Sequence, residues 1–112
     1  MNDTILNNLK FDVEKSVKDL LGEKLIKVLL YGSYARGDFD PESDVDFALI
    51  TQITENEISS YNEKIGRITS SLSIKYGVLV SIIIISLEMF DDYKDILPFY
   101  RNIIKEGKVI YG

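Results

Sequence analysis

The chain has 112 residues, the size of one domain, and 46% of them are hydrophobic, which is enough to form a core. It has no Cys and no His, which excludes disulfides, thiol nucleophiles, the usual zinc sites and the commonest general base. Any bound metal must therefore take oxygen ligands, as magnesium, manganese and calcium do.

The net charge is -5, with a pI near 4.7. An acidic surface repels phosphate backbones and argues against non-specific nucleic-acid binding. Residues 1–8 lack the basic and apolar regions of a signal peptide, and the longest apolar stretch, Val78 to Leu87, is too short to span a bilayer. We therefore expect a cytoplasmic protein that forms one domain over residues 1–112 and does not enter a membrane.

The first helix is predicted from apolar residues that recur every three or four positions and from a glycine that suits its end. These residues are Ile5, Leu9, Val13, Val17, Leu20 and Gly22. Leu25 to Tyr31 is a short apolar run before a glycine, which predicts a buried strand. Ser33 to Arg36 can open a helix, Gly37 to Ser43 is a polar loop, and Val45 to Thr51 is a second predicted strand.

In the second half, Thr54 and Glu57 have the spacing of a capping box at the start of a helix. Its apolar face comprises Ile58, Tyr61, Ile65, Ile68 and Leu72. We expect a third strand at Val78 to Ser86, a helix from about Asp95 to Glu106 stopped by Gly107, and an edge strand at Lys108 to Tyr111. This order predicts an α/β fold whose helices cover at least one face of the sheet, while strand direction stays open.

The stretch that carries chemistry runs from Gly32 to Phe47 and reads GSYARGDFDPESDVDF. Gly32 and Ser33 directly follow a strand. Glycine permits close approach of backbone to a ligand, and the N–H groups of a helix that starts here would favour phosphate. Taken alone, such a pair is more often an ordinary turn. Arg36 can contact triphosphate oxygens, although the acidic loop that follows it favours an internal ion pair.

Asp44 and Asp46 open the next strand. Residues two apart on a strand point to the same side, roughly 6.5 to 7 Å apart at the backbone, so both carboxylates can converge on magnesium while Val45 and Phe47 face the core. Without other motifs, two aspartates spaced in this way are normally just the solvated start of a strand. An EF-hand beginning at Asp38 is excluded, because its required glycine and glutamate are replaced by Ser43 and Leu49.

The two motifs together are more specific than either alone because of their order and spacing. Ten residues separate Gly32-Ser33 from the Asp44-Val45-Asp46 triplet. This pattern resembles the nucleotidyltransferase superfamily that includes DNA polymerase beta. The match is closest to its minimal branch, the MNT antitoxins encoded beside HEPN toxins. The C-terminal stretch LPFYRNIIKEGKVIYG is also similar to the tail of small nucleotidyltransferase-domain proteins.

The resemblance implies a polymerase-beta-like fold, with a small mixed sheet of three to four strands. It implies that Gly32 and Ser33 bind the triphosphate of ATP, with Arg36 inside the same motif, and that Asp44 and Asp46 are the catalytic carboxylates that coordinate Mg²⁺ or Mn²⁺. It further implies transfer of AMP to a hydroxyl group. In the MNT branch, the acceptor is a tyrosine of the HEPN toxin, which is silenced.

The chain departs from the family at a third carboxylate, which active members usually carry on the next long strand. Ser81 stands at about that position, and Glu88 just beyond the strand is a candidate substitute. Activity can persist with two carboxylates, since positioning and metal charge supply most of the catalysis in phosphoryl transfer.

Two other functions stay open. The domain could instead be a binding module that neutralises its partner by contact, or a nucleotidyltransferase acting on a small substrate. The acceptor, the nucleotide preference and any homo-oligomer are not decided by the sequence.

Overall fold

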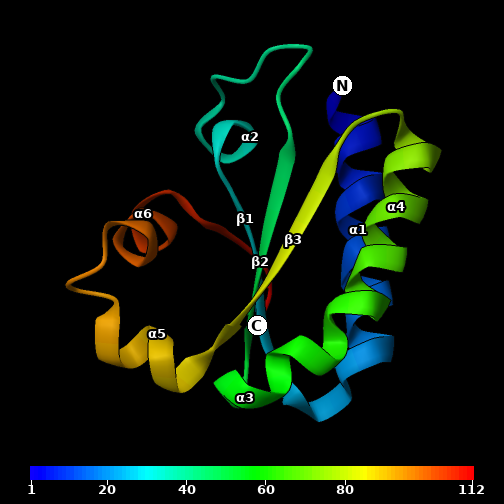
Figure 1. Cartoon of the computed structure of the whole chain (residues 1–112). Coiled ribbons are helices and arrows are strands. Elements are labelled where there is room, and N and C mark those ends of the chain that lie inside the picture. The colour runs from blue at the N-terminus through cyan, green and yellow to red at the C-terminus, as the bar shows by residue number, and fades with distance from the viewer.

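The computed structural model describes all 112 residues and shows a four-stranded sheet between two layers of helices (Figure 1). The strands are β1 (Leu25–Tyr31), β2 (Val45–Thr51), β3 (Val80–Ser86) and β4 (Lys108–Tyr111), in the order β3-β2-β1-β4. β1 pairs antiparallel with β2 and β4, whereas β2 pairs parallel with β3. The mixed sheet agrees with the fold expected from the resemblance. None of the helices has the length and apolarity needed to cross a membrane.

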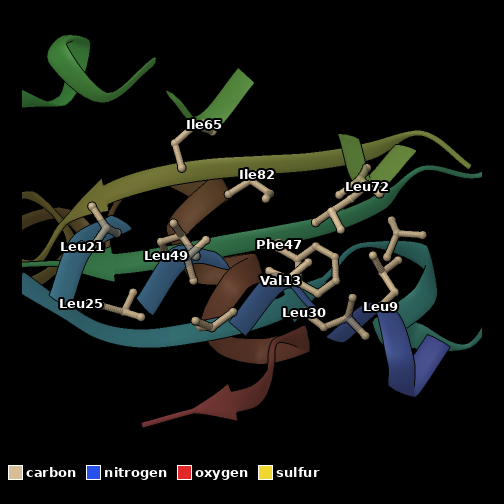
Figure 2. Packing of buried hydrophobic residues seen from close by; sticks show 14 of the residues in the cluster. Leu9, Val13, Leu21, Leu25, Leu30, Phe47, Leu49, Ile65, Leu72 and Ile82 are labelled. Atoms are coloured by element: carbon tan, nitrogen blue, oxygen red, sulfur yellow. The ribbon is translucent and has the colours of Figure 1, made fainter. Parts of the chain in front are cut away.

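One face of the sheet is covered by α1 (Asp3–Leu21) and α4 (Asn62–Tyr76). α1 turns a stripe of buried residues toward the sheet, and these are Leu9, Val13, Val17 and Leu21. Figure 2 shows Leu9 and Val13 close to Phe47 of β2 in the largest hydrophobic cluster. The predicted face differs at both ends, because Ile5 is exposed and Leu21, rather than Leu20, is fully packed.

The opposite face is covered by α5 (Leu87–Tyr93) and α6 (Pro98–Glu106), which lie across the sheet from α1 and α4 in Figure 1. A smaller hydrophobic cluster lies beneath them, and its buried members are Leu29, Ala48, Ile50, Ile85 and Ile103. Since both faces are covered, every residue of β2 except Asp46 is buried. Asp46 therefore lies at the one place where this strand reaches solvent.

The structure differs from the prediction in the segment after β2. The single helix expected from Thr54 is divided into α3 (Glu55–Ile58), a 3-10 turn (Ser59–Tyr61) and α4. The capping box is also wrong, because the Thr54 hydroxyl donates to the Glu57 carboxylate at 2.8 Å instead of capping a backbone N–H. The helix begins where predicted, although its side-chain cap does not form.

The last third of the chain differs in two further ways. β3 begins at Val80, two residues later than predicted, after Gly77 ends α4 in the left-handed conformation. The residues between β3 and β4 form two helices, α5 and α6, where one was expected. The bounds predicted for β1, α2 (Ser33–Arg36), β2 and β4 are all confirmed.

Candidate active site

Three neighbouring strands bring Tyr31, Asp46 and Ser81 into one row. In the antiparallel pair, Tyr31 of β1 stands opposite Asp46 of β2, and in the parallel pair Asp46 stands opposite Ser81 of β3. Because side chains alternate along a strand, Asp46 shares the face of Ala48, which packs in the cluster beneath α6. The row therefore lies on the α5–α6 face of the sheet, at the end from which β2 and β3 start.

Gly32 and Asp46 are in direct contact. Gly32 has φ 76° and ψ -158°, a backbone conformation open almost only to glycine, and it precedes the first turn of α2. A Cβ atom at this position would collide with Oδ2 of Asp46 and lie 3.3 Å from its Cγ. The glycine-serine turn and the Asp46 carboxylate, which the sequence motif predicts to share one site, are thus adjacent in the structure.

The short helix α2 fixes that turn from the other side. The Gly32 carbonyl accepts backbone hydrogen bonds from Ala35 at 3.0 Å and Arg36 at 3.1 Å, which closes the helical turn. Tyr34 is buried and stacks on Phe39 with ring centroids 4.2 Å apart, which braces the loop leading to Asp44. Ser33, at the first position of the helix, is only partly buried and faces no such packing.

The charges of Asp44 and Arg36 both affect Asp46. Burial raises the pKa of Asp46 above its ordinary value, the charge of Asp44 raises it further, and Arg36 opposes both. Asp44 is exposed just before β2, and Val45 and Phe47 are fully buried on the opposite face, as the alternation predicts. Two neighbouring carboxylates of this kind suit a hard divalent cation, whose charge would offset both their repulsion and the loss of hydration.

No third acidic side chain joins this pair, since the structure contains no cluster of three carboxylates able to hold a metal. Ser81 occupies the position beside Asp46. Glu88 lies beyond the other end of β3, after about 16 Å of strand that separates Ser81 from Ser86. The interpretation of Glu88 as a substitute for the third acid is therefore wrong.

Arg36 forms two ion pairs at the edge of the site. Its Nε lies 3.1 Å from Asp38, as expected for a carboxylate of the loop, and its Nη1 lies 3.0 Å from Glu106 at the end of α6. These two partners raise the pKa of Arg36. The pair with Glu106 was missed, because no local pattern connects residues seventy positions apart.

A pocket of about 200 Å³ opens where α6 meets this turn. It is lined by Tyr31, Gly32, Arg36, Phe99, Asn102, Ile103 and Glu106. Helix α6 thereby becomes one wall of the candidate site, which the sequence motif alone did not indicate.

Comparison with known protein families identifies the family of this chain. The nucleotidyltransferase domain family matches residues 12–111, a range that includes the whole motif and the row on the sheet. The chain belongs to this family. It is accordingly an enzyme of the nucleotidyltransferase class, and the expectation drawn from the motif is confirmed at that level.

Two relatives agree with this assignment. "Putative protein adenylyltransferase MJ0604" of Methanocaldococcus jannaschii is 31% identical over 105 residues, which cover 88% of this chain and 97% of the relative. "Putative protein adenylyltransferase MJ0141" of the same organism is 42% identical over 73 residues, covering 65% and 72% of the two chains.

Two solved structures share the fold at low identity. One is a crystal structure of a toxin-antitoxin with AMP-PNP, with a TM-score of 0.60, 17% identity and coverage of 92% of this chain and 73% of that one. The other is described as a putative nucleotidyltransferase from Sulfolobus solfataricus, with a TM-score of 0.59, 19% identity and coverage of 97% and 87%. They support the architecture alone.

Proposed function

We propose that this protein is a metal-dependent adenylyltransferase that moves AMP from ATP to a hydroxyl group of a partner protein. The contact between Gly32 and Asp46 carries the proposal, because it joins a phosphate-binding turn to a cation-binding carboxylate. The names of the relatives, protein adenylyltransferases, support a protein as the acceptor.

The residues of the site divide into two groups. Gly32, Ser33 and Arg36 bind the triphosphate through backbone N–H groups, a hydroxyl and a guanidinium. Asp44 and Asp46 hold Mg²⁺, and Mn²⁺ also suits their oxygen atoms. When bound, the cation neutralises charge on the phosphates and helps to align the reacting groups. In the transfer, the acceptor oxygen bonds to the α-phosphorus, pyrophosphate leaves, and the hydroxyl proton passes to solvent.

The proposed acceptor is a tyrosine of a toxin partner of the HEPN type. The fold shared with solved toxin-antitoxin structures supports a toxin as partner, and one of these carries an ATP analogue. Within the site, burial and the charge of Asp46 raise the pKa of the chain's own Tyr31 to about 12.

A second function, neutralisation of the partner by binding alone, is favoured by one observation. Ser81 stands beside Asp46 where a third carboxylate would complete the site, and a hydroxyl is a weak magnesium ligand and no base near neutral pH. In that case the nucleotide site would be kept for binding or assembly, without efficient transfer.

One experiment separates the two functions. The protein is incubated with ATP, Mg²⁺ and the product of its neighbouring gene, and the partner's mass is measured. We expect the addition of one or more AMP units, which the double variant Asp44→Asn, Asp46→Asn abolishes. An unmodified, intact partner in the presence of tightly bound ATP would contradict the enzymatic function. Neutralisation of the partner by the folded double variant would establish the binding function instead.

A further inference from the structure

The stretch from Lys94 to Lys108, which contains α6, differs in charge from the rest of the chain and from α5, whose charged residues are all acidic. Between Lys94 and Lys108 there are four cationic and two acidic side chains, although the whole chain has a net charge of -5. One of the two acids, Glu106, is engaged by Arg36 of the candidate site. The outer surface of α6 is therefore a local region of positive charge on an acidic molecule.

This positive charge surrounds a hollow. A surface pocket of about 500 Å³ opens on α6, and its walls include Lys94, Asp95, Arg101, Asn102, Ile104 and Lys105. Arg101 and Lys105 lie one helical turn apart and are exposed, and neither is within ion-pair distance of a carboxylate of this chain. Two unpaired cations at a concave surface attract a carboxylate from outside.

Large apolar side chains are also exposed on α6 and on the turn that precedes it. Ile96 is 66% exposed and Ile104 is 53% exposed, and Leu97 and Phe99 lie between them in sequence and are also exposed. We call Ile96, Leu97, Phe99, Arg101, Ile104 and Lys105 the α6 surface. Exposed apolar side chains close to charged ones are typical of protein-binding sites. Phosphate groups gain nothing from the apolar members, which favours a protein over a nucleic acid.

The α6 surface adjoins the nucleotide site. Asn102 lines the large pocket and also the smaller pocket that contains Gly32 and Arg36. The ion pair between Arg36 and Glu106 ties the end of α6 to the turn that holds the triphosphate. A protein seated on α6 would thus lie directly beside the proposed site of transfer.

We propose that the α6 surface docks the acceptor protein, and that the docked part is an acidic segment carrying apolar side chains. The occupant's role as acceptor rests on the proposed function, whereas the chemistry of the segment rests on the surface alone. Carboxylates of the segment pair with Arg101 and Lys105, and its apolar side chains cover Ile96 and Ile104. Docking there delivers the acceptor hydroxyl to the nucleotide.

The test uses three labelled probes and the whole chain, with binding followed by fluorescence anisotropy. The probes are a peptide of alternating Glu and Leu with one Tyr, the same peptide with Lys for Glu, and single-stranded oligouridine. The charge-reversal variant is Arg101→Glu, Lys105→Glu. Its matched control is Lys15→Glu, Lys64→Glu, which makes the same change in net charge on exposed positions of α1 and α4.

We expect the acidic peptide to bind the wild-type chain and the control variant equally, and the charge-reversal variant about ten-fold or more weakly. Binding should weaken as salt is added, because exposed charges are screened. The neutral variant Arg101→Gln, Lys105→Gln should show an intermediate loss, which keeps the test valid if the reversal variant misfolds.

Several results would overturn the proposal. These are no binding of the acidic peptide at about 1 mM, an equal loss in both double variants, or preferential binding of oligouridine. A dimer that the charge-reversal variant converts to monomers would assign the surface to a second copy. ATP affinity, measured in parallel, should be unchanged in the reversal variant. If ATP does not bind the wild-type chain while the peptide does, the proposed function fails and the docking surface stands.

Discussion

Gly32 leaves no space for a side chain between its own backbone and the carboxylate of Asp46. The cause is the strand register, since Tyr31, the residue before this glycine, is paired with Asp46 in the antiparallel ladder. The ten residues between the turn and Asp44 are the chain needed to form α2 and return along a wide loop to β2. The spacing of the motif is thus a consequence of how β1 and β2 pair.

Replacing Gly32 by Ala should lower the free energy of unfolding by about 2 kcal/mol and weaken ATP binding by about ten-fold or more. The new methyl group strains the backbone and displaces the Asp46 carboxylate. Gly37→Ala is the matched control, because Gly37 also has a positive φ but has nothing within 4 Å of its Cβ position. It should cost about 1 kcal/mol and leave ATP affinity unchanged. Denaturant unfolding and calorimetric titration with ATP measure both effects, and equal losses of ATP affinity would contradict the explanation.

Replacing Ser81 by Asp should strengthen the metal site, because it places a third carboxylate beside Asp46 in the parallel ladder. Without metal, the added charge should destabilise the fold by about 1 kcal/mol. With Mg²⁺, the thermal midpoint should rise more than in the wild type, and AMP transfer should increase by about ten-fold or more. Ser81→Asn, similar in size and uncharged, serves as the control. If the thermal midpoint of Ser81→Asp did not change on addition of Mg²⁺, position 81 would not face the cation.

Asp46 should reduce the stability of the metal-free fold as the pH rises. Burial and Asp44 raise its pKa in the folded state above the ordinary value of 3.8, so the folded protein binds the proton more tightly than the unfolded chain does. Stability attributable to this group is therefore greatest below pH 3.8 and is lost as the pH rises through the raised pKa. At neutral pH, Asp46→Asn should raise the free energy of unfolding by about 0.5 kcal/mol, so the variant unfolds at a higher denaturant concentration than the wild type. The same substitution should abolish activity. The two proteins should converge near pH 3, and a constant difference across the range would refute the assignment.

Substitutions of Arg36 and Glu106 should affect ATP affinity differently, although the two residues form one ion pair. Arg36→Gln removes a cation from the proposed triphosphate site and should weaken ATP binding by about ten-fold. Glu106→Gln removes only its competitor, so ATP affinity should be equal to or higher than that of the wild type. Arg36→Gln breaks two ion pairs that are largely exposed to solvent and Glu106→Gln breaks one, so neither change should alter stability much. Equal weakening by both substitutions would mean that the pair acts only by positioning α6.

Much of the candidate site was accessible from the sequence because its signals are local. β1 and β2 are short apolar runs bounded by turn residues, and the alternation from Asp44 to Phe47 correctly separated the buried residues from the polar ones. The expected ion pair of Arg36 with a loop carboxylate was also local, and Asp38 confirms it. Ser81 falls opposite Asp46, although only the three-dimensional pairing shows this.

What the sequence did not predict depends on contacts between distant segments. Ser86, directly before α5, is a residue type favoured at helix N-caps, but the apolar pattern assigned it to the end of the strand, and its side chain makes no capping hydrogen bond in the structure. Strand direction is set by packing and connection, which leave no mark on the pattern of apolar residues. For the same reason, the role of α6 as a wall of the site became visible only through its Glu106, Asn102 and Phe99.

The central position of β2 determines which parts of the molecule open first. β2 is bonded on both edges and buried on both faces, so its amides should exchange with solvent deuterium most slowly. α5 and α6 rest on the smaller cluster and expose several apolar side chains, so they are expected to detach at lower free energy. A partial opening of that layer would release α5 and α6 while the strand bearing Asp46 keeps its native conformation.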